Sequence, residues 1–234
     1  FSVYYETNWL RKMQKQFQFD LIISDNRFGF YHKQLPSIFI THQLNIQTGF
    51  SFTDTLVRWL QYRYIKKFSS LWIPDIEGSL NYAGVLSNPL NKPSIPTWYL
   101  GALSRLSPNN HQQALEPIQF LGIVSGPEPQ RTLFENTLWM QGNAGDAAFA
   151  IVAGRPKGNN EPAISNKGKL YPHVDGTSLA ELIESAEYII FRGGYTSLME
   201  LIPFQKKLII IPTPGQTEQE YLAKWWETNG WAIS

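Results

Sequence analysis

The sequence predicts an α/β protein with two domains, each built on a doubly wound parallel sheet, and three observations lead to this prediction. Short continuous apolar runs such as residues 21–23 and 38–40 are typical of strands covered on both faces. These runs alternate with longer segments that have the pattern of helices, which is the order of a parallel sheet. Residues 104–116 interrupt the alternation with polar residues and proline. We therefore expect a first domain over 1–104, a linker over 105–116 and a second domain over 117–234.

The first domain is expected to combine apolar strands with two helices. The strands are predicted at 20–24, 37–41, 71–73 and 97–100, and the helices at 6–17 and 52–68. At 100° per residue, the second helix has an apolar face that we expect to be buried: Leu56, Val57, Leu60, Tyr64 and Phe68. Its other face is basic and aromatic: Arg58, Trp59, Tyr62, Arg63 and Lys66. That face is either ordinary solvated surface or a membrane contact.

In the second domain the alternation of strands and helices begins again. Strands are predicted at 117–124, 147–152, 188–191 and 207–212, and helices at 130–140, 178–185, 196–202 and 218–228. Doubly wound sheets bind ligands at the carboxyl ends of their strands. The polar motifs of this chain follow the predicted strands, so the binding site is expected there.

The composition excludes several classes of function. A formal net charge of +1 over 234 residues argues against a general nucleic-acid binder, which would have a marked basic excess. The absence of cysteine excludes disulfides, thiolate catalysis and cysteine-ligated metals, and it favours a reducing compartment such as the cytoplasm. No apolar run reaches the roughly 18 residues that cross a membrane. The chain begins at Phe1 without a Met or a signal-peptide pattern, so we expect a missing upstream segment.

The first polar motif is GIVSGPEPQR at 122–131, where a strand passes through a loop of small residues into a helix. Backbone N–H groups and the helix dipole make such a turn attractive to phosphate, here at Ser125 and Gly126. Pro127 and Pro129 remove two of the donors, so a simple tight turn is the alternative interpretation.

The second motif is RGGYTSLME at 192–200, again between a strand and a helix. Its two glycines allow a ligand to approach the backbone closely. Glu200 carries a carboxylate that can accept hydrogen bonds from a ribose diol. The alternative is structural, because Ser197 and Glu200 also satisfy the pattern of a capping box.

The third motif is PTPGQTEQEY at 212–221, which follows a β-branched strand. Gln216, Glu218 and Gln219 place amides beside a carboxylate at a helix start, and sugar hydroxyls need both donors and acceptors. The alternative is again a helix cap, formed by Thr217 with Glu220.

Together these motifs resemble the donor-binding domain of GT-B glycosyltransferases, an architecture of two Rossmann-like domains with a cleft between them. Residues 192–200 are similar to the Arg-Ser-Gly-Ala-x-Thr-x-x-Glu signature of glycosyltransferase family 28, the family of MurG-type N-acetylglucosamine transferases. The resemblance implies that Glu200 holds the ribose and that Gln216, Glu218 and Gln219 contact the sugar. His173 and Val174, which end a short strand, would face the base. Gly193, Gly194 and Thr196 would approach the diphosphate, and Arg192 and Tyr195 would belong to the same donor-binding segment. Ser125 and Gly126 would face the phosphates or the acceptor.

The first domain carries two polar stretches at predicted strand ends. One contains Asp25, Asn26 and Arg27, and the other contains His42, Gln43 and Asn45, similar to a His-Glu-Gln-Asn stretch of the same family. Both would face the acceptor side of the cleft. His42 is a candidate base, although a histidine at a strand end is more often structural. The family's Gly-rich first segment, which carries the expected base, has no counterpart before Glu6, so the catalytic base is not identified.

The resemblance implies a transferase that moves a sugar, expected to be an N-acetylhexosamine, from a UDP-sugar to an acceptor. The acceptor would be lipid-linked in a family member that works at the inner membrane face. The reaction would be an inverting displacement without a metal ion, with backbone N–H groups stabilising the departing diphosphate. The absence of an Asp-x-Asp pattern agrees with this. Alternatives are a nucleotide-sugar hydrolase or epimerase with the same donor domain, and a non-catalytic nucleotide-binding subunit.

Overall fold

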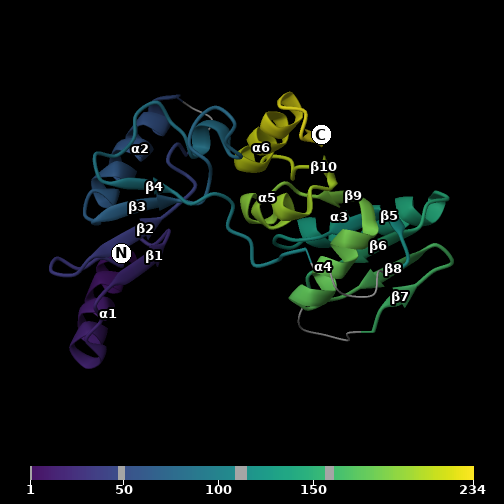
Figure 1. The fold of residues 1–234 in the computed structure, drawn as a ribbon, viewed down its shortest axis with the longest axis horizontal. Helices are drawn as coiled ribbons and strands as arrows, with labels where there is room; N and C mark the ends of the chain where they lie inside the picture. The colour runs from purple at the N-terminus through teal and green to yellow at the C-terminus, as the bar shows by residue number, and fades with distance from the viewer. Residues whose placement is uncertain (1, 47–50, 109–114, 156–160) are drawn as a thin grey trace. The chain divides into compact units, whose positions relative to one another are not determined.

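The computed structural model describes residues 2–46, 51–108, 115–155 and 161–234. The chain divides into two compact units, Phe1–Leu103 and Ser104–Ser234 (Figure 1). Each unit contains a sheet that is wholly or mainly parallel, together with helices, so the predicted α/β class with parallel sheets is confirmed.

The first unit contains a four-stranded parallel sheet in the order β1-β2-β3-β4. Its elements are α1 (Ser2–Phe17), β1 (Ile22–Asp25), β2 (Ser37–Ile40), α2 (Ser51–Ile65), β3 (Ser70–Ile73), the 3-10 turn η1 (Gly84–Leu86) and β4 (Thr97–Tyr99). Phe39 and Leu71 from the sheet pack against Ile65 and Phe68 at the end of α2. These contacts form the apolar core of the unit.

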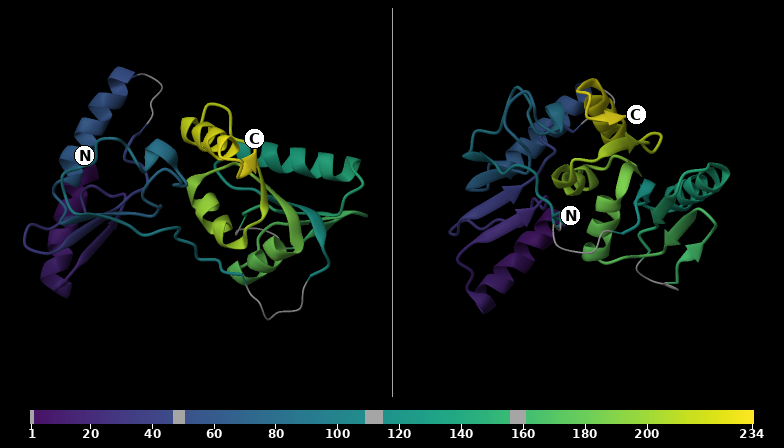
Figure 2. Two further views of the ribbon diagram at one scale, coloured as in Figure 1. Left: turned by 45° about the horizontal axis from the view of Figure 1, so that its top comes forward. Right: turned by 45° about the vertical axis from the view of Figure 1, so that its right-hand side comes forward.

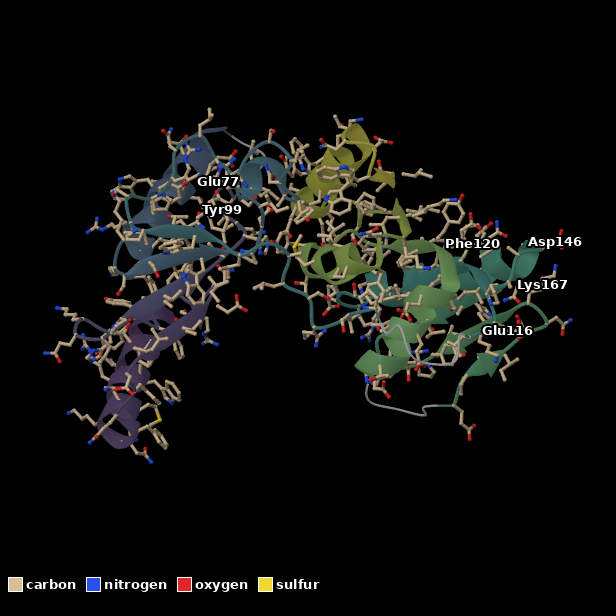
Figure 3. The ribbon with its side chains drawn as sticks, viewed as in Figure 1. Glu77, Tyr99, Glu116, Phe120, Asp146 and Lys167 are labelled. Atoms are coloured by element: carbon tan, nitrogen blue, oxygen red, sulfur yellow. The ribbon has the colours of Figure 1, made fainter. Side chains whose placement is uncertain are left out.

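The long connection between β3 and β4 is organised by one buried carboxylate. Asp75 accepts hydrogen bonds from the backbone N–H groups of Ile76 and Tyr82, both at 2.7 Å, and from Ala83 at 3.0 Å. Lys92 pairs with Glu77 at 2.8 Å, and its Nζ lies 4.7 Å from the ring centroid of Tyr99. Glu77 and Tyr99 are labelled in Figure 3. These polar contacts give a mostly irregular connection, in which η1 is a short 3-10 turn, a defined shape.

The predicted faces of α2 are only partly correct: Phe68 is buried and Arg63 and Lys66 are exposed as expected, but the start of the apolar face is not buried. Gln61 is buried, and its amide donates to the carbonyl of Gln43, whereas Leu56 and Leu60 are 50% and 42% exposed. The exposed face therefore carries apolar residues near the helix start, together with Trp59, and the cations Arg63 and Lys66 near its end. The 100° periodicity identified two faces, but the buried arc contains Gln61 and Ile65 in place of Leu56 and Leu60.

The second unit contains a seven-stranded sheet in the order β11-β10-β9-β5-β6-β8-β7. The strands are β5 (Ile118–Ile123), β6 (Phe149–Val152), β7 (Ala163–Ile164), β8 (Gly168–Tyr171), β9 (Ala186–Phe191), β10 (Lys207–Ile210) and β11 (Ala232–Ile233). All pairs are parallel except β7 with β8. The chain order reverses at β5, which lies between β6 and β9, and such a switch point is where doubly wound sheets bind ligands.

Helices cover both faces of this sheet. They are α3 (Gln130–Ala144), α4 (Gly176–Ser185), α5 (Tyr195–Leu201) with the 3-10 turn η2 (Ile202–Phe204), and α6 (Thr217–Thr228). Figure 2 shows α3 and α4 on opposite sides of the sheet. The side chains agree, because Phe134 of α3 packs with Phe149 and Ile151 of β6. The weakly apolar strands β7 and β11, each two residues long, were not predicted.

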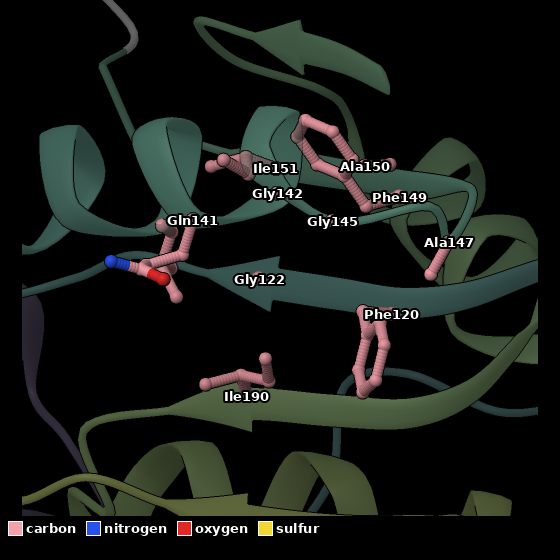
Figure 4. A pocket seen from close by; sticks show the side chains of 11 residues that line it. Phe120, Gly122, Gln141, Gly142, Gly145, Ala147, Phe149, Ala150, Ile151 and Ile190 are labelled. Carbon is pink, nitrogen blue, oxygen red and sulfur yellow. The ribbon is translucent and has the colours of Figure 1, made fainter. Parts of the chain in front are cut away.

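The helix α3 packs closely on the sheet at Phe149 of β6. Cβ atoms added to Gly142 and Gly168 would lie 2.7 and 2.2 Å from the ring of Phe149, which is itself 5% exposed. An apolar cavity of about 240 Å³ lies beside this ring, near the end of α3 (Figure 4). Among the residues that line this cavity, Gln141 alone has a polar side chain, and its amide can form hydrogen bonds.

Candidate functional site

Four loops of the second unit follow parallel strands and therefore emerge at one edge of the sheet. They come after β5, β8, β9 and β10, the strands that precede Ser125, His173, Arg192 and Gln216 in the chain. The cavity beside Phe149 is at the opposite end of α3, so it is separate from this edge. The fold thus brings the polar motifs of the second unit to the edge where a ligand site was expected.

The loop after β9 depends on its two glycines in different ways. Gly193 has φ +74°, in the left-handed region that favours glycine. Gly194 has φ −63° and is the N-cap residue of α5. Nothing lies within 4 Å of a Cβ added to Gly194. Gly193 is therefore required by the backbone, whereas Gly194 leaves open space in front of the helix. Tyr195 is buried, and Thr196 is exposed at the start of α5.

Arg192, predicted to lie near the donor, makes its contacts with the protein. Its guanidinium lies 4.0 Å from the ring centroid of Phe134, and the side chain is mostly buried. Its N–H groups donate to the carbonyl oxygens of Ile211, Pro212 and Gln130 at 3.3 to 3.4 Å. Burial lowers the pKa of Arg192 from its usual value. The residue joins three segments of the edge, namely the loops after β9 and β10 and the start of α3.

Glu200 does not form the capping box that was the structural alternative. The N-cap of α5 is Gly194, with no side-chain hydrogen bond to the cap. The Glu200 carboxylate instead accepts from Arg105, whose Nε lies 2.8 Å from Oε1. The Glu200 side chain is 15% exposed and that of Arg105 is 84% exposed. Arg105 was assigned to the linker, and sequence analysis gave it no role.

The loop after β10 is held by its own amides. Oε1 of Gln219 accepts from the N–H of Thr213 at 2.9 Å, and the Gln219 amide donates to Gln216. The N-cap of α6 is Gln216, and Glu220 accepts from the N–H of Gly215 at 2.8 Å, so the predicted cap by Thr217 with Glu220 is wrong. Glu218 lies half-buried in the first turn of α6. The predicted sugar-contacting residues are thus close together on one loop and helix start.

The loop after β5 is less suited to phosphate than its position suggests. Ser125 is exposed and Gly126 has φ +100°, as in the predicted turn. However, the Glu128 carboxylate accepts from the Thr132 N–H at 3.3 Å and pairs with Arg131. The hydrogen bond from Thr132, followed by the contact with Arg131, holds the pKa of Glu128 below its usual range. A protein carboxylate therefore already occupies the start of α3.

The loop after β8 contains His173 and Val174, followed by a helix cap. His173 is exposed and Val174 is half-buried. Asp175 is the N-cap of α4, and its carboxylate accepts from the Ser178 N–H at 2.8 Å. That hydrogen bond lowers the pKa of Asp175. Asp175 was missed by sequence analysis, although an acid three residues before Ser178 is a typical helix-start signal.

The predicted acceptor-side residues follow β1 and β2 in the first unit. Arg27 pairs with Glu6 at 2.8 Å, and the Asn26 side chain accepts from the Thr41 hydroxyl at 3.3 Å. Asp25 ends β1 and is exposed. The Gln43 carbonyl binds the Gln61 amide, and Asn45 accepts from Arg58 at 3.2 Å. His42 directly precedes Gln43 in the chain and is half-buried. The fold brings the two stretches to neighbouring strand ends.

Residues 144–233 match the model of the glycosyltransferase family 28 C-terminal domain. Over 112 residues the chain is 28% identical to a UDP-N-acetylglucosamine–N-acetylmuramyl-(pentapeptide) pyrophosphoryl-undecaprenol N-acetylglucosamine transferase of Sulfurihydrogenibium sp. (strain YO3AOP1). That match covers 46% of this chain and 30% of the relative.

Two solved structures show the same fold at low identity. MurG of Acinetobacter baumannii has a TM-score of 0.54 and 13% identity, covering 97% of this chain and 62% of that one. Spinosyn rhamnosyltransferase SpnG, complexed with thymidine diphosphate, has a TM-score of 0.58 and 11% identity, covering 99% of this chain and 64% of that one. The chain therefore spans less than two thirds of the length of these relatives.

The fold is that of the GT-B glycosyltransferases, as the motifs predicted. The residues that carry the donor motifs after β9 and β10 lie within the segment matched by the family 28 C-terminal domain, so the resemblance to that family is confirmed.

Proposed function

We propose that the protein transfers a sugar from a UDP-sugar to an acceptor. The observation that carries the proposal is the arrangement of polar loops at one edge of the sheet, three of them inside the segment that matches the family 28 C-terminal domain. The proposal is supported by a relative named for N-acetylglucosamine transfer and by a similar fold that was solved with thymidine diphosphate.

The proposed donor contacts follow from the geometry of each loop. Glu200 has a carboxylate on α5 that is available to a ribose diol, and Gly194 leaves the space that a diphosphate needs. Gln216 and Glu218 lie at the start of α6, where they are suited to sugar hydroxyls. His173 and Val174 would contact the base. Arg192 would act indirectly, because it holds the loop after β10 to the start of α3.

We propose that the reaction is an inverting displacement in which backbone N–H groups, rather than a metal ion, meet the charge of the departing diphosphate. Within the described ranges, no group of three or more His, Asp or Glu side chains is arranged to hold a metal ion. An N-acetylhexosamine is the proposed sugar and a lipid-linked molecule the proposed acceptor, both by similarity to the curated relative.

A lipid-linked acceptor requires access to a membrane surface, and the exposed face of α2 is the proposed contact. Leu56, Trp59 and Leu60 are exposed near its start, and Arg63 and Lys66 near its end. Apolar residues beside cations suit the boundary of an anionic bilayer. In the described part of the chain, no helix combines the length and apolar character needed to cross a bilayer. The proposed location is the cytoplasmic membrane face.

The direct test is thermal unfolding in the presence of nucleotides. A ligand that binds only the folded protein raises the melting temperature, and the rise grows with the ratio of ligand concentration to the dissociation constant. UDP or a UDP-sugar at millimolar concentration is expected to raise it, and GDP, dTDP and CMP conjugates are expected to do so less. A melting temperature that no member of this panel changes would contradict the proposed function.

A further inference from the structure

Residues 104–106 are seated on the second unit by contacts on both sides of Arg105. The Ser104 hydroxyl donates to the Leu106 carbonyl at 2.7 Å and lies 3.4 Å from the carbonyl oxygen of Glu200. Leu106 is 8% exposed, so its side chain is part of the packed unit. Arg105 is therefore fixed at its backbone although its side chain is solvated. Its contact with Glu200 is made from an anchored position.

The guanidinium of Arg105 takes one oxygen of the Glu200 carboxylate. Both Nε and Nη2 donate to Oε1. Each carboxylate oxygen has about two acceptor positions, so Oε2 and the remaining capacity of Oε1 can accept two further hydroxyl donors. Because two N–H groups of the planar guanidinium hold one carboxylate oxygen in place, the carboxylate cannot rotate freely about its Cγ–Cδ bond. The pairing thus orients the acceptor atoms of Glu200 and leaves room for a diol.

We propose that Arg105 is a positioning residue that orients Glu200 toward the ribose hydroxyls of the nucleotide, an inference that rests on the proposed function. Glu200 is the sixth residue of the seven-residue helix α5, where the helix dipole disfavours a carboxylate. Arg105 supplies a cation beside this carboxylate. An exposed ion pair contributes little to stability, so the effect of Arg105 is expected in ligand recognition.

The test compares UDP with 2′-deoxy-UDP, which lacks one of the hydroxyl groups that Glu200 would accept. Isothermal titration of the full chain gives both dissociation constants for the wild type and for Arg105→Gln. The wild type is expected to bind UDP more tightly. Arg105→Gln is expected to weaken UDP binding on the order of tenfold and to leave 2′-deoxy-UDP binding unchanged, so the discrimination disappears.

Lys207→Gln is the matched control, because Lys207 pairs with Glu187 at 2.8 Å at the amino end of β10, away from the carboxyl edge. It removes the same charge and should change neither constant. Thermal melts show whether each variant is folded.

Each remaining outcome overturns the inference in a distinct way. Equal weakening of both nucleotides by Arg105→Gln would mean a direct contact with the diphosphate. Tighter UDP binding would mean that Arg105 competes with the ribose, and unchanged binding would mean a purely structural pair. If the wild type binds UDP and 2′-deoxy-UDP equally well, the ribose role of Glu200 and the positioning role of Arg105 are overturned, whereas the proposed function is not. A wild type that binds neither nucleotide would overturn the proposed function itself.

Discussion

A Cβ atom added to Gly193 would lie 2.4 Å from Cγ2 of Ile210, the last residue of the neighbouring strand β10. Ile210 is 1% exposed, so its side chain lies in the packed core. The loop after β9 thus packs directly on β10, and only glycine fits at its first position after Arg192. The adjacent Gly194 has no such neighbour.

Substitutions at the two glycines should therefore affect different properties: stability at Gly193 and ligand binding at Gly194. Gly193→Ala combines a clash with φ +74° and is expected to destabilise the protein by about 2–4 kcal/mol. Gly194→Ala should leave stability nearly unchanged and weaken UDP binding, because its methyl group enters the space proposed for the diphosphate. Urea denaturation and titration on both variants check this. Loss of stability in Gly194→Ala with intact binding would contradict the proposed approach of the ligand.

Glu200→Gln should weaken nucleotide binding more than it harms stability. The loss of a charge-assisted contact to a diol is expected to cost ~1.5–3 kcal/mol of affinity. Ser197→Ala is the control, because the structure shows no capping box between the two residues, and it should change neither property. Titration with UDP and a urea melt measure both. Intact binding in Glu200→Gln would remove this residue from the site.

The cap at Asp175 predicts a pH dependence of stability. The pKa of this carboxyl is lowered by the hydrogen bond from the Ser178 N–H. A carboxyl with a depressed folded-state pKa adds stability above its unfolded pKa of about 3.9, and this stability is lost as the pH falls through the folded-state value. Asp175→Ala should therefore lower the melting temperature at pH 7, and its difference from the wild type should shrink below about pH 3.9.

Asp175→Asn is the matched variant, because asparagine caps helices about as well as aspartate. Its melting temperature at pH 7 should stay close to that of the wild type. If the melting temperature of Asp175→Ala stays below that of the wild type by the same amount from pH 7 to strongly acidic pH, the ionised cap is not the cause of the difference.

The exposed face of α2 predicts salt-sensitive binding to anionic vesicles. Each cation near an anionic surface contributes about 1 kcal/mol, so Arg63→Gln with Lys66→Gln should reduce binding roughly thirtyfold at low salt. Arg58 is left intact because it bonds to Asn45. Replacing Arg11 and Lys12 on α1 with Gln removes the same charge and should have a smaller effect. Co-sedimentation that is equal in both double variants would rule out α2 as the contact.

The sequence predicted most of the elements because buried parallel strands are continuous apolar runs, as at Ile189–Ile190 and Leu208–Ile210. It failed at the faces of α2. Leu56 and Leu60 have the apolar character of core residues, and periodicity alone does not show which arc the sheet selects. Only the packed structure shows that Gln61 is an inner residue, with its amide satisfied by the Gln43 carbonyl.

For the candidate site, strand order and loop position were predictable, and side-chain partners were not. The motifs after β9 and β10 were recognised because glycines and amides at strand ends have a local signature. The pairing of Arg105 with Glu200 spans 95 residues, and no local pattern marks it. Arg192 was expected near the donor because it belongs to the segment 192–200 that resembles the family signature. Its position over Phe134 depends on the tertiary packing of α3.

The ring of Phe149 between Gly142 and Gly168 ties three distant positions into one steric unit. A side chain added at position 142 or 168 would meet this ring, so the ring would have to move or be replaced by a smaller side chain. In a library selected only for folding, a side chain at position 142 or 168 should appear together with a smaller residue at 149. These positions would then covary although they take no part in ligand binding.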